Sequence, residues 1–556
     1  MTVHRSVLAS TALLGLLASC APGAERGGAL PGGVELSEER LRSDIRTLSS
    51  DAFEGRGPAS PGEEKTVEFL VDQFRDIGLE PANGDAYTQE VPLVSITVEG
   101  RPALRFGGAG GASELAWGTD FVAWTKRVQE HVSLDDSELV FVGYGIVAPE
   151  YGWNDYEGLD VRGKTVVMLV NDPGFATQDP DLFNGNAMTY YGRWTYKYEE
   201  AARQGAAGAL IVHETAPAGY PWAVVQGSWT GPQFGLESED GNASRVAVEG
   251  WITGERAREL FAMAGEDFDA LQQAAARPGF RARPLPVRAS VELDNHIERS
   301  VSRNVVGMLP GSERPDEAIL FMAHWDHLGR TSDDVPDPIF NGAFDNATGT
   351  AGLLELARAF ASLPERPARS LLFVAVTAEE QGLLGSAYYA EHPLVPTHKT
   401  VAAINMDGLN VLGPMRDVTV IGLGNSELDR YLLEAAQEQG RVLTPDPEPE
   451  KGFYYRSDHF SLAKVGIPSL YLEGGTDHVE HGREWTTQQK DDYTLNRYHK
   501  PSDEYDPSWD LRGAVQDLEL LYRVAFTLAN GDAWPEWAEG NEFRAIREAD
   551  LAAHRD

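Results

Sequence analysis

The sequence predicts an α/β protein: an open, mostly parallel sheet wound with helices on both faces, and a smaller β-rich domain inserted into it. From Asn304 onward, apolar runs of strand length alternate with amphipathic helical stretches, the pattern of repeated β–α–β units. Between about Ala112 and Leu293 the pattern changes to short apolar runs separated by Gly, Pro and Asp, with few helical stretches. At 556 residues the chain also exceeds one ordinary domain of about 100 to 200 residues.

The composition is that of a folded globular protein with a large negative charge. Hydrophobic residues make up 42% of the chain, and 47 Lys and Arg against 86 Asp and Glu give a net charge of −39. Because a field of this sign repels nucleic acid and anionic surfaces, we expect no nucleic-acid partner. Most of the charge is expected to be solvated surface, which indicates little about the substrate.

The first twenty residues have the layout of an export signal. A basic start with His4 and Arg5 precedes an apolar stretch from Val7 to Ala18, and the segment ends in Leu17-Ala18-Ser19-Cys20. This ending resembles the lipoprotein box of bacterial signal peptides, which implies cleavage before Cys20 and lipidation of that cysteine. A plain signal peptide with an incidental cysteine is the alternative.

An exported, lipid-anchored protein follows from this resemblance. We predict a lipoprotein signal peptide over residues 1–20 and a flexible, Gly-rich spacer over 21–33. The anchor on Cys20 would hold the protein at a bacterial membrane, facing the periplasm or the cell surface. Cys20 is the single cysteine of the sequence, so intramolecular disulfides are excluded.

The next two units are the first part of the main domain, residues 34–111, and the insert, residues 112–293. In Glu63 to Gly78 apolar residues recur at steps of three and four before a glycine, which predicts a surface helix. Within the insert, Tyr196 to Gly205 followed by Ala206 to Val212 predicts a helix, a glycine turn and a strand. This stretch resembles the protease-associated domain of exported peptidases; a generic α/β insert is the alternative.

Residues 294–531 are predicted to carry the parallel sheet, and residues 532–556 to form a C-terminal tail. A helix is predicted over Gly349 to Leu363. Four apolar runs have the length and composition of buried parallel strands: Ala318 to Ala323, Ser370 to Val376, Val401 to Met406 and Pro468 to Leu472.

Polar side chains directly after these runs are candidates for a site, because open α/β sheets bind ligands beyond the carboxyl ends of their strands. Singly, each candidate has an ordinary explanation as a turn residue or helix cap. Together they are imidazoles and carboxylates gathered at one rim, without a thiolate, which suits zinc. The candidates are His324, Asp326, Glu379, Glu380 and Asp407 after strands, with Asp345 and His499 from loops.

These motifs resemble, in order and spacing, those of the M28 family of zinc exopeptidases. The resemblance covers about Arg303 to Leu528, with Asp51 to Val94 before the insert, and implies a sheet of the zinc exopeptidase type. Its motifs are His324-x-Asp326, Asp345-Asn346-Ala347-x-Gly349, Glu379-Glu380, Asn405-Met406-Asp407 and His499-x-Pro501-x-Asp503.

The resemblance implies two Zn2+ ions as cofactors and peptides as substrates. Asp345 would bridge both ions, His324 and Asp407 would complete one site, and Glu380 and His499 the other. Each zinc would then have three protein ligands and a position shared with water, as in catalytic zinc sites.

It also implies roles for three carboxylates that do not bind metal. Glu379 would act as general base. Asp326 would orient the His324 ring, and Asp503 is expected to do the same for His499.

The predicted reaction is hydrolysis of a terminal peptide bond, with release of the N-terminal residue favoured. A carboxypeptidase stays open because Arg456 and Arg497, near the motifs, could hold a terminal carboxylate. Less favoured are a single-zinc glutaminyl cyclase of a related fold and a non-catalytic surface binding protein. The insert is expected to cap the site and restrict access to short peptides. The sequence predicts no oligomeric state.

Two further segments place a histidine directly after an acidic residue. His478-Val479-Glu480-His481 is not a His-Glu-x-x-His motif, and we expect it to be a loop near the mouth of the site. Ser457-Asp458-His459 resembles a segment near the substrate pocket of the family, with no role readable from its spacing.

Overall fold

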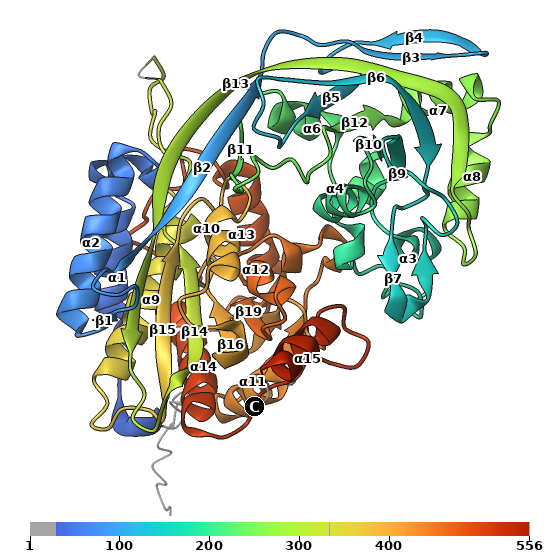
Figure 1. The fold of residues 1–556 in the computed structure, drawn as a ribbon. Helices are drawn as coiled ribbons and strands as arrows, with labels where there is room; N and C mark the ends of the chain where they lie inside the picture. The colour runs from blue at the N-terminus through green and yellow to red at the C-terminus, as the bar shows by residue number, and fades with distance from the viewer. Residues whose placement is uncertain (1–28, 333, 555–556) are drawn as a thin grey trace, which may run out of the picture.

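The computed structural model describes residues 29–332 and 334–554, which form two lobes (Figure 1). The predicted signal peptide, Cys20 and most of the predicted spacer lie outside the described residues. No helix in the described part of the chain has the length and apolar character needed to cross a membrane.

The main lobe contains one sheet between two layers of helices. Its helices are α1 (Glu38–Leu48), α2 (Pro61–Ile77), α9 (Thr348–Ala361), α10 (Leu384–Glu391), α11 (Leu428–Glu438), α12 (His459–Lys464), α13 (Gly482–Asn496), α14 (Arg512–Asn530) and α15 (Arg544–Ala553). Its strands are β1 (Glu80–Pro81), β2 (Thr88–Val98), β13 (Arg283–Leu309), β14 (Arg314–His324), β15 (Arg369–Val376), β16 (Thr400–Asn405), β17 (Asp417–Val420), β18 (Val442–Pro445) and β19 (Ser469–Gly474).

The centre of this sheet is parallel and its edges are mixed. Strand β14 pairs in parallel with β15 on one side and with β16 on the other, and β16 pairs in parallel with β19. Strands β13 and β17 add to the two sides in antiparallel fashion. After β15 the chain therefore crosses over β14 to form β16. This reversal creates a switch point at the carboxyl end of β14, where open α/β sheets bind ligands.

Alternate residues of the central strands pack against different helical layers, because successive side chains of a strand point to opposite faces. Ile319 and Phe321 of β14 belong to a core that also contains side chains of α1, α2, α9 and α14. Leu320 and Met322 belong to a second core, with Tyr389 of α10 and residues of α12. The sheet is thus wound on both faces, and the predicted fold class is confirmed.

The second lobe is built on its own mixed sheet, whose strands are β3 (Leu104–Gly108), β4 (Gly111–Leu115), β5 (Phe121–Trp124), β6 (His131–Phe141), β9 (Thr165–Leu169), β10 (Gly208–His213) and β12 (Val248–Thr253). Strands β7 (Val147–Ala148) and β8 (Trp153–Asn154) form a separate two-stranded sheet, and β11 (Gln233–Leu236) pairs with β2 of the main lobe. Strands β6, β9, β10 and β12 run parallel in that order. Its helices, more than the sequence pattern indicates, are α3 (Pro173–Thr177), α4 (Trp194–Arg203), α5 (Thr215–Ala218), α6 (Trp222–Trp229), α7 (Gly254–Met263) and α8 (Phe268–Ala275).

A single long strand joins the lobes. The first half of β13 pairs with β6 and β3 in the insert, and its second half pairs with β2 and β15 in the main lobe (Figure 1). Strand β3 precedes residue 112, the predicted start of the insert, and β13 crosses residue 294, its predicted end. The domain limits taken from the sequence stay predictions.

The helices and strands for which the sequence analysis gives residue ranges are all present, within a few residues of those ranges. The predicted helix, turn and strand of the insert are α4 and β10. The predicted tail, 532–556, contains α15, whose Arg547 is buried and donates hydrogen bonds to the carbonyls of Thr397 and Thr400. This helix therefore packs on the main lobe.

Candidate metal centre

Three strand ends meet at the switch point and carry candidate side chains. His324 is the last residue of β14, Glu379 and Glu380 lie three and four residues after β15 ends, and Asp407 follows β16 by two residues. Because β15 and β16 flank β14, their carboxyl ends lie on either side of His324. The residues that the sequence predicted from their positions after strands therefore lie together at the carboxyl ends of β14, β15 and β16.

Asp345 reaches the same rim from a π-helical turn, η5 (Ala343–Ala347), that leads into α9. The next residue, Asn346, fixes this turn to the Asp407 loop. Its Nδ2 donates to the carbonyl of Met406 at 3.0 Å, and its Oδ1 accepts from the backbone N–H of Gly408 at 3.0 Å. The peptide bond between Asp345 and Asn346 is cis.

The first cluster surrounds the ring of His324. Its Nε2 lies 3.2 Å from Oδ1 of Asp407, 3.4 Å from Oδ1 of Asp345 and 4.0 Å from Oε2 of Glu379. On the other side of the ring, Nδ1 lies 3.1 Å from the carbonyl oxygen of Asp326. The ring is fully buried, and its Nε2 faces three carboxylates.

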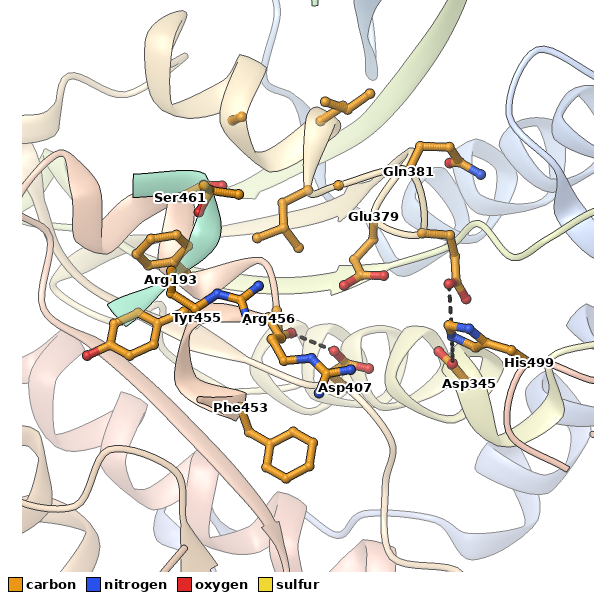
Figure 2. A pocket seen from close by; sticks show the side chains of 18 of the residues that line it. Arg193, Asp345, Glu379, Gln381, Asp407, Phe453, Tyr455, Arg456, Ser461 and His499 are labelled. Atoms are coloured by element: carbon orange, nitrogen blue, oxygen red, sulfur yellow. Dashed lines mark hydrogen bonds and ion pairs between the residues drawn. The ribbon is translucent and has the colours of Figure 1, made fainter. Parts of the chain in front are cut away.

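The second cluster surrounds Glu380. Nε2 of His499 lies 3.0 Å from Oε2 of Glu380 and 3.3 Å from Oδ2 of Asp345. Nδ1 of His327 lies 2.6 Å from Oε1 of Glu380. Asp345 thus faces His324 with one carboxylate oxygen and His499 with the other, and it joins the two clusters. Figure 2 shows the side of Asp345 that faces His499.

The two clusters hold more carboxylates than histidines, so their unbalanced charge is negative. Burial opposes protonation of His324, yet the neighbouring Glu379 and Asp407 raise its pKa well above the usual range. His499 also resists protonation through burial, but hydrogen bonds with Asp345 and Glu380 raise its pKa to about 10. Buried carboxylates in such numbers are stable only when a cation or bound protons balance their charge.

The donor set fits zinc. Imidazole nitrogens and carboxylate oxygens are ordinary zinc ligands, and the site is buried yet opens to a cavity. The carboxylate of Glu380 is buried between two imidazole rings, with Oε1 beside Nδ1 of His327 and Oε2 beside Nε2 of His499. Within the described residues, His324, Glu379 and Asp407 form one group with metal-binding spacing, and His327, Asp345 and Glu380 form another.

Glu379 and Asp326 differ from the other carboxylates. Burial raises the pKa of Glu379 well above its usual range, so this carboxylate favours the protonated form. Asp326 is fully buried and accepts hydrogen bonds from the backbone N–H of Glu379 at 3.1 Å and of Glu380 at 3.4 Å. Its carboxylate lies 3.9 Å from Nδ1 of His324, and its closer contacts fix the loop after β15.

Asp503 also holds a loop. Its oxygens accept hydrogen bonds from the backbone N–H of Phe344 and of Asp345, each at 3.1 Å, and from the hydroxyl of Tyr493 at 3.2 Å. Within the described residues, Asp503 forms no hydrogen bond or ion pair with His499, contrary to the expectation from the sequence. The His499 ring stacks instead on Tyr498, with centroids 3.8 Å apart. Asp503 therefore positions the bridging carboxylate.

Three supporting residues have no role in the sequence-based prediction. Arg56 is completely buried and donates to four backbone carbonyls around the site. Ser457 donates from Oγ to Oδ2 of Asp407 at 2.6 Å, which assigns a role to a segment noted only for its resemblance. His327 follows the same strand end as His324, so the strand-end rule could have found it.

The His478 and His481 pair is separate from this centre. Nδ1 of His478 accepts hydrogen bonds from the backbone N–H of Glu480 at 3.1 Å and of His481 at 3.0 Å. Neither histidine is among the described residues that line the cavity at the metal centre. The pair stabilises a loop, as expected, without lining the mouth of the site.

A cavity of about 2140 Å³ lies between the lobes and opens onto the centre. Asp345, Glu379, Asp407 and His499 line it from the main lobe (Figure 2). Trp124, Lys126, Arg193 and Tyr220 are among the residues that line it from the insert. A substrate at the centre is therefore enclosed partly by the insert.

Residues 304–522 match the family model described as peptidase family M28. This stretch contains every residue of the two clusters. The matched region therefore includes the whole candidate metal centre.

Similar proteins include one named as an aminopeptidase and one named as a carboxypeptidase homolog. The chain is 30% identical over 169 residues, 29% of its length and 21% of the relative, to aminopeptidase NAALADL1 of Mus musculus. It is 33% identical over 202 residues, 34% of its length and 24% of the relative, to the glutamate carboxypeptidase 2 homolog of Caenorhabditis elegans. The matched stretches thus span about a quarter or less of these relatives. Among solved structures, an aminopeptidase from Aneurinibacillus sp. strain AM-1 shares 21% identity, with a TM-score of 0.47, over 89% of this chain and 94% of that one.

Proposed function

We propose that the protein is a two-zinc exopeptidase that hydrolyses terminal peptide bonds, most readily as an aminopeptidase. The observation that carries the proposal is the position of Asp345, whose two oxygens face His324 and His499 on opposite sides. A carboxylate placed this way can serve two cations at once. His324 and Asp407 would complete one zinc site, and Glu380 and His499 the other.

When bound, the two zinc ions would polarise the scissile carbonyl and lower the pKa of a water molecule at the site. Glu379 accepts the proton of the attacking water and passes it to the leaving amine. Its raised pKa, caused by burial, suits a group that must hold this proton between the two steps. Asp326 accepts a hydrogen bond from the backbone N–H of Glu379, and this bond keeps the Glu379 carboxylate in place.

His327 is a further residue available to the second site, because it contacts Glu380 directly. In the proposal it holds Glu380 in place, as a ring hydrogen-bonded to a metal ligand commonly does. The backbone N–H of His327 donates to the carbonyl of Arg56 at 3.3 Å, so its own position is fixed.

The carboxypeptidase is retained as the second candidate because a guanidinium, Arg456, lines the cavity beside the centre. A single-zinc cyclase and a binding protein without catalysis are the remaining alternatives. They predict one bound zinc ion and none, respectively, against two for the exopeptidase.

The place of action proposed for the chain is outside the cytoplasm. The support is the signal layout of the first twenty residues, whose ending resembles a lipoprotein box. In this proposal a lipid on Cys20 tethers the folded lobes, and the protease-associated-type insert faces the peptides that approach the cavity.

Substitution of the general base tests the function. Glu379→Gln should lose hydrolysis of aminoacyl reporters by at least about 100-fold while its zinc content stays that of the native protein. Glu391→Gln is the matched control, since Glu391 lines the same cavity at the end of α10 and touches neither cluster. Full activity in the Glu379→Gln protein would refute the assigned role. N-blocked dipeptides with a free carboxylate, measured in parallel, decide the direction of attack.

A further inference from the structure

Two arginines from different lobes extend into the cavity without an acidic partner. Arg193 precedes α4 of the insert, and Arg456 follows η8 (Phe453–Tyr455) of the main lobe. Both line the cavity, and Figure 2 shows their side chains within it. Within the described part of the chain, neither guanidinium forms an ion pair with a carboxylate.

Several other cations of this cavity form ion pairs with carboxylates. Lys451 pairs with Glu448 at 2.6 Å, Lys464 with Glu199 at 2.8 Å and Arg497 with Asp492 at 3.0 Å. In a protein with a net charge of −39, carboxylates are abundant. Lys126 and Arg245 line the cavity as well and, within the described residues, also form no ion pair. Arg193 and Arg456 differ from these two because they lie near each other in the cavity (Figure 2), where the charge of Arg456 helps to lower the pKa of Arg193.

The pair is held at an electrostatic cost. Nε of Arg193 is buried and lacks a hydrogen-bond partner. Burial, and then the nearby charge of Arg456, lower the pKa of Arg193 to about 10. The hydroxyl of Tyr220 lies in the field of both arginines. An anion bound between the guanidiniums would relieve their repulsion and satisfy the buried donor.

The pair lies close to the metal centre. Arg456 directly precedes Ser457, whose Oγ donates to Asp407 at 2.6 Å. Arg456 also lines the same cavity as Tyr498, the ring that stacks on His499, and as His499 itself. An extended peptide advances about 3.3 to 3.6 Å per residue. A group held by Arg456 is therefore within about one or two residues of a peptide bond at the centre.

We infer that Arg193 and Arg456 form a carboxylate-binding subsite, which selects short peptides with a free carboxylate one or two residues from the scissile bond. The inference rests on the proposed function and names its substrate class. Guanidinium groups bind carboxylates through paired, charge-assisted hydrogen bonds, and the planar fork of arginine suits this geometry better than lysine. The carboxylate comes either from the C-terminus of a di- or tripeptide or from an acidic side chain.

Because the two arginines belong to different lobes, a bound carboxylate would also link the insert to the main lobe. The contact between lobes is already extensive on this side: Tyr190 of the insert packs against Phe460 at 5.1 Å between ring centroids. The subsite therefore gives the insert a direct part in substrate selection, beyond covering the centre.

The test compares matched substrates in the native protein. The pairs are Leu-Ala and its amide, Leu-Ala-Ala and its amide, and the nitroanilides of Glu and Gln. A charge-assisted pair of hydrogen bonds predicts a kcat/KM about 10- to 100-fold higher for the carboxylate member of at least one pair. Preference within the peptides identifies the C-terminal carboxylate as the ligand, and preference within the nitroanilides identifies the side chain. Equal kcat/KM within all pairs would overturn the subsite.

Two variants and a control assign the preference to the arginines. Arg193→Met and Arg456→Met should each bring the ratio of kcat/KM between the carboxylate and amide members of a pair toward one. Lys451→Met removes a cation of the same cavity that has its own carboxylate, and it should keep the preference. A preference that survives in both arginine variants would contradict the assignment.

Calorimetry separates this inference from the proposed function, because it does not depend on turnover. Tighter binding of Leu-Ala than of its amide, in the absence of any hydrolysis, would support the subsite and refute the exopeptidase. Hydrolysis with equal binding and equal kcat/KM within all three pairs would refute the subsite alone.

Discussion

Arg56 offers the sharpest test of how the fold holds the centre. Its guanidinium is completely buried and donates to four carbonyl oxygens, those of Leu48 and Trp325 at 2.8 Å, Gly342 at 2.7 Å and Asn341 at 2.6 Å. These carbonyls belong to the last residue of α1, the segment after His324 and the loop before Asp345. One side chain therefore fixes three segments that converge on the site.

Arg56→Met removes all four donors while keeping an unbranched, apolar side chain. Each buried carbonyl left without a donor costs about 1 to 3 kcal/mol. The four carbonyls together would cost about 4 to 12 kcal/mol. Since the loop will relax and water will satisfy part of the set, we expect the free energy of unfolding to fall by about 4 kcal/mol, the lower end of this range. Folded domains are stable by about 5 to 15 kcal/mol, so this loss removes a large part of the stability.

Urea unfolding of the native protein, Arg56→Met and Arg56→Lys measures the effect. The lysine variant keeps the charge but loses the planar fork, so its stability should lie between the other two. A methionine variant within about 1 kcal/mol of native would refute the conclusion that Arg56 organises the site.

Three further substitutions test other parts of the account. Asp326→Asn should lower kcat by about 10- to 100-fold with zinc retained, because the amide loses one of the acceptors that hold Glu379 and Glu380; an unchanged kcat would contradict this. Burial lowers the pKa of His459 to about 3. Between about pH 6.5 and pH 3 the unfolded chain therefore binds a proton that the folded state excludes. The free energy of unfolding should fall as the pH drops through this range, by at most about 1.4 kcal/mol per pH unit. Urea unfolding at several pH values should show a shallower fall in His459→Gln, and equal slopes would refute this reading. His478→Asn should keep the full zinc content in metal analysis, and loss of zinc would reassign that loop to the metal centre.

The sequence predicted the parallel sheet because its strands are buried on both faces and therefore read as continuous apolar runs. Residues 318–323 are an example: alternate side chains pack on opposite helical layers, and all are apolar. The insert was harder to describe, because its short helices lie between strands and lack a long apolar stripe. Helix α6, with Val225 and Trp229 as its buried residues, is such a case.

The residues of the centre were predictable because strand ends and motif spacing both mark them. Their supports were less visible. Arg56 acts on main-chain carbonyls, which no pattern of side chains reveals. Asp503 was expected beside His499, yet its position depends on the path of the Asp345 loop, which brings two N–H groups to it. The pairing of Arg193 with Arg456 depends on how the lobes face each other.

Zinc analysis of the native, metal-saturated protein tests the central claim most directly. If Asp345 joins two sites, completed by His324 with Asp407 and by Glu380 with His499, the protein should bind two zinc ions per chain. Asp345→Ala should then weaken both sites together. A native stoichiometry of one or zero, or an Asp345→Ala protein that still binds two ions tightly, would contradict the account.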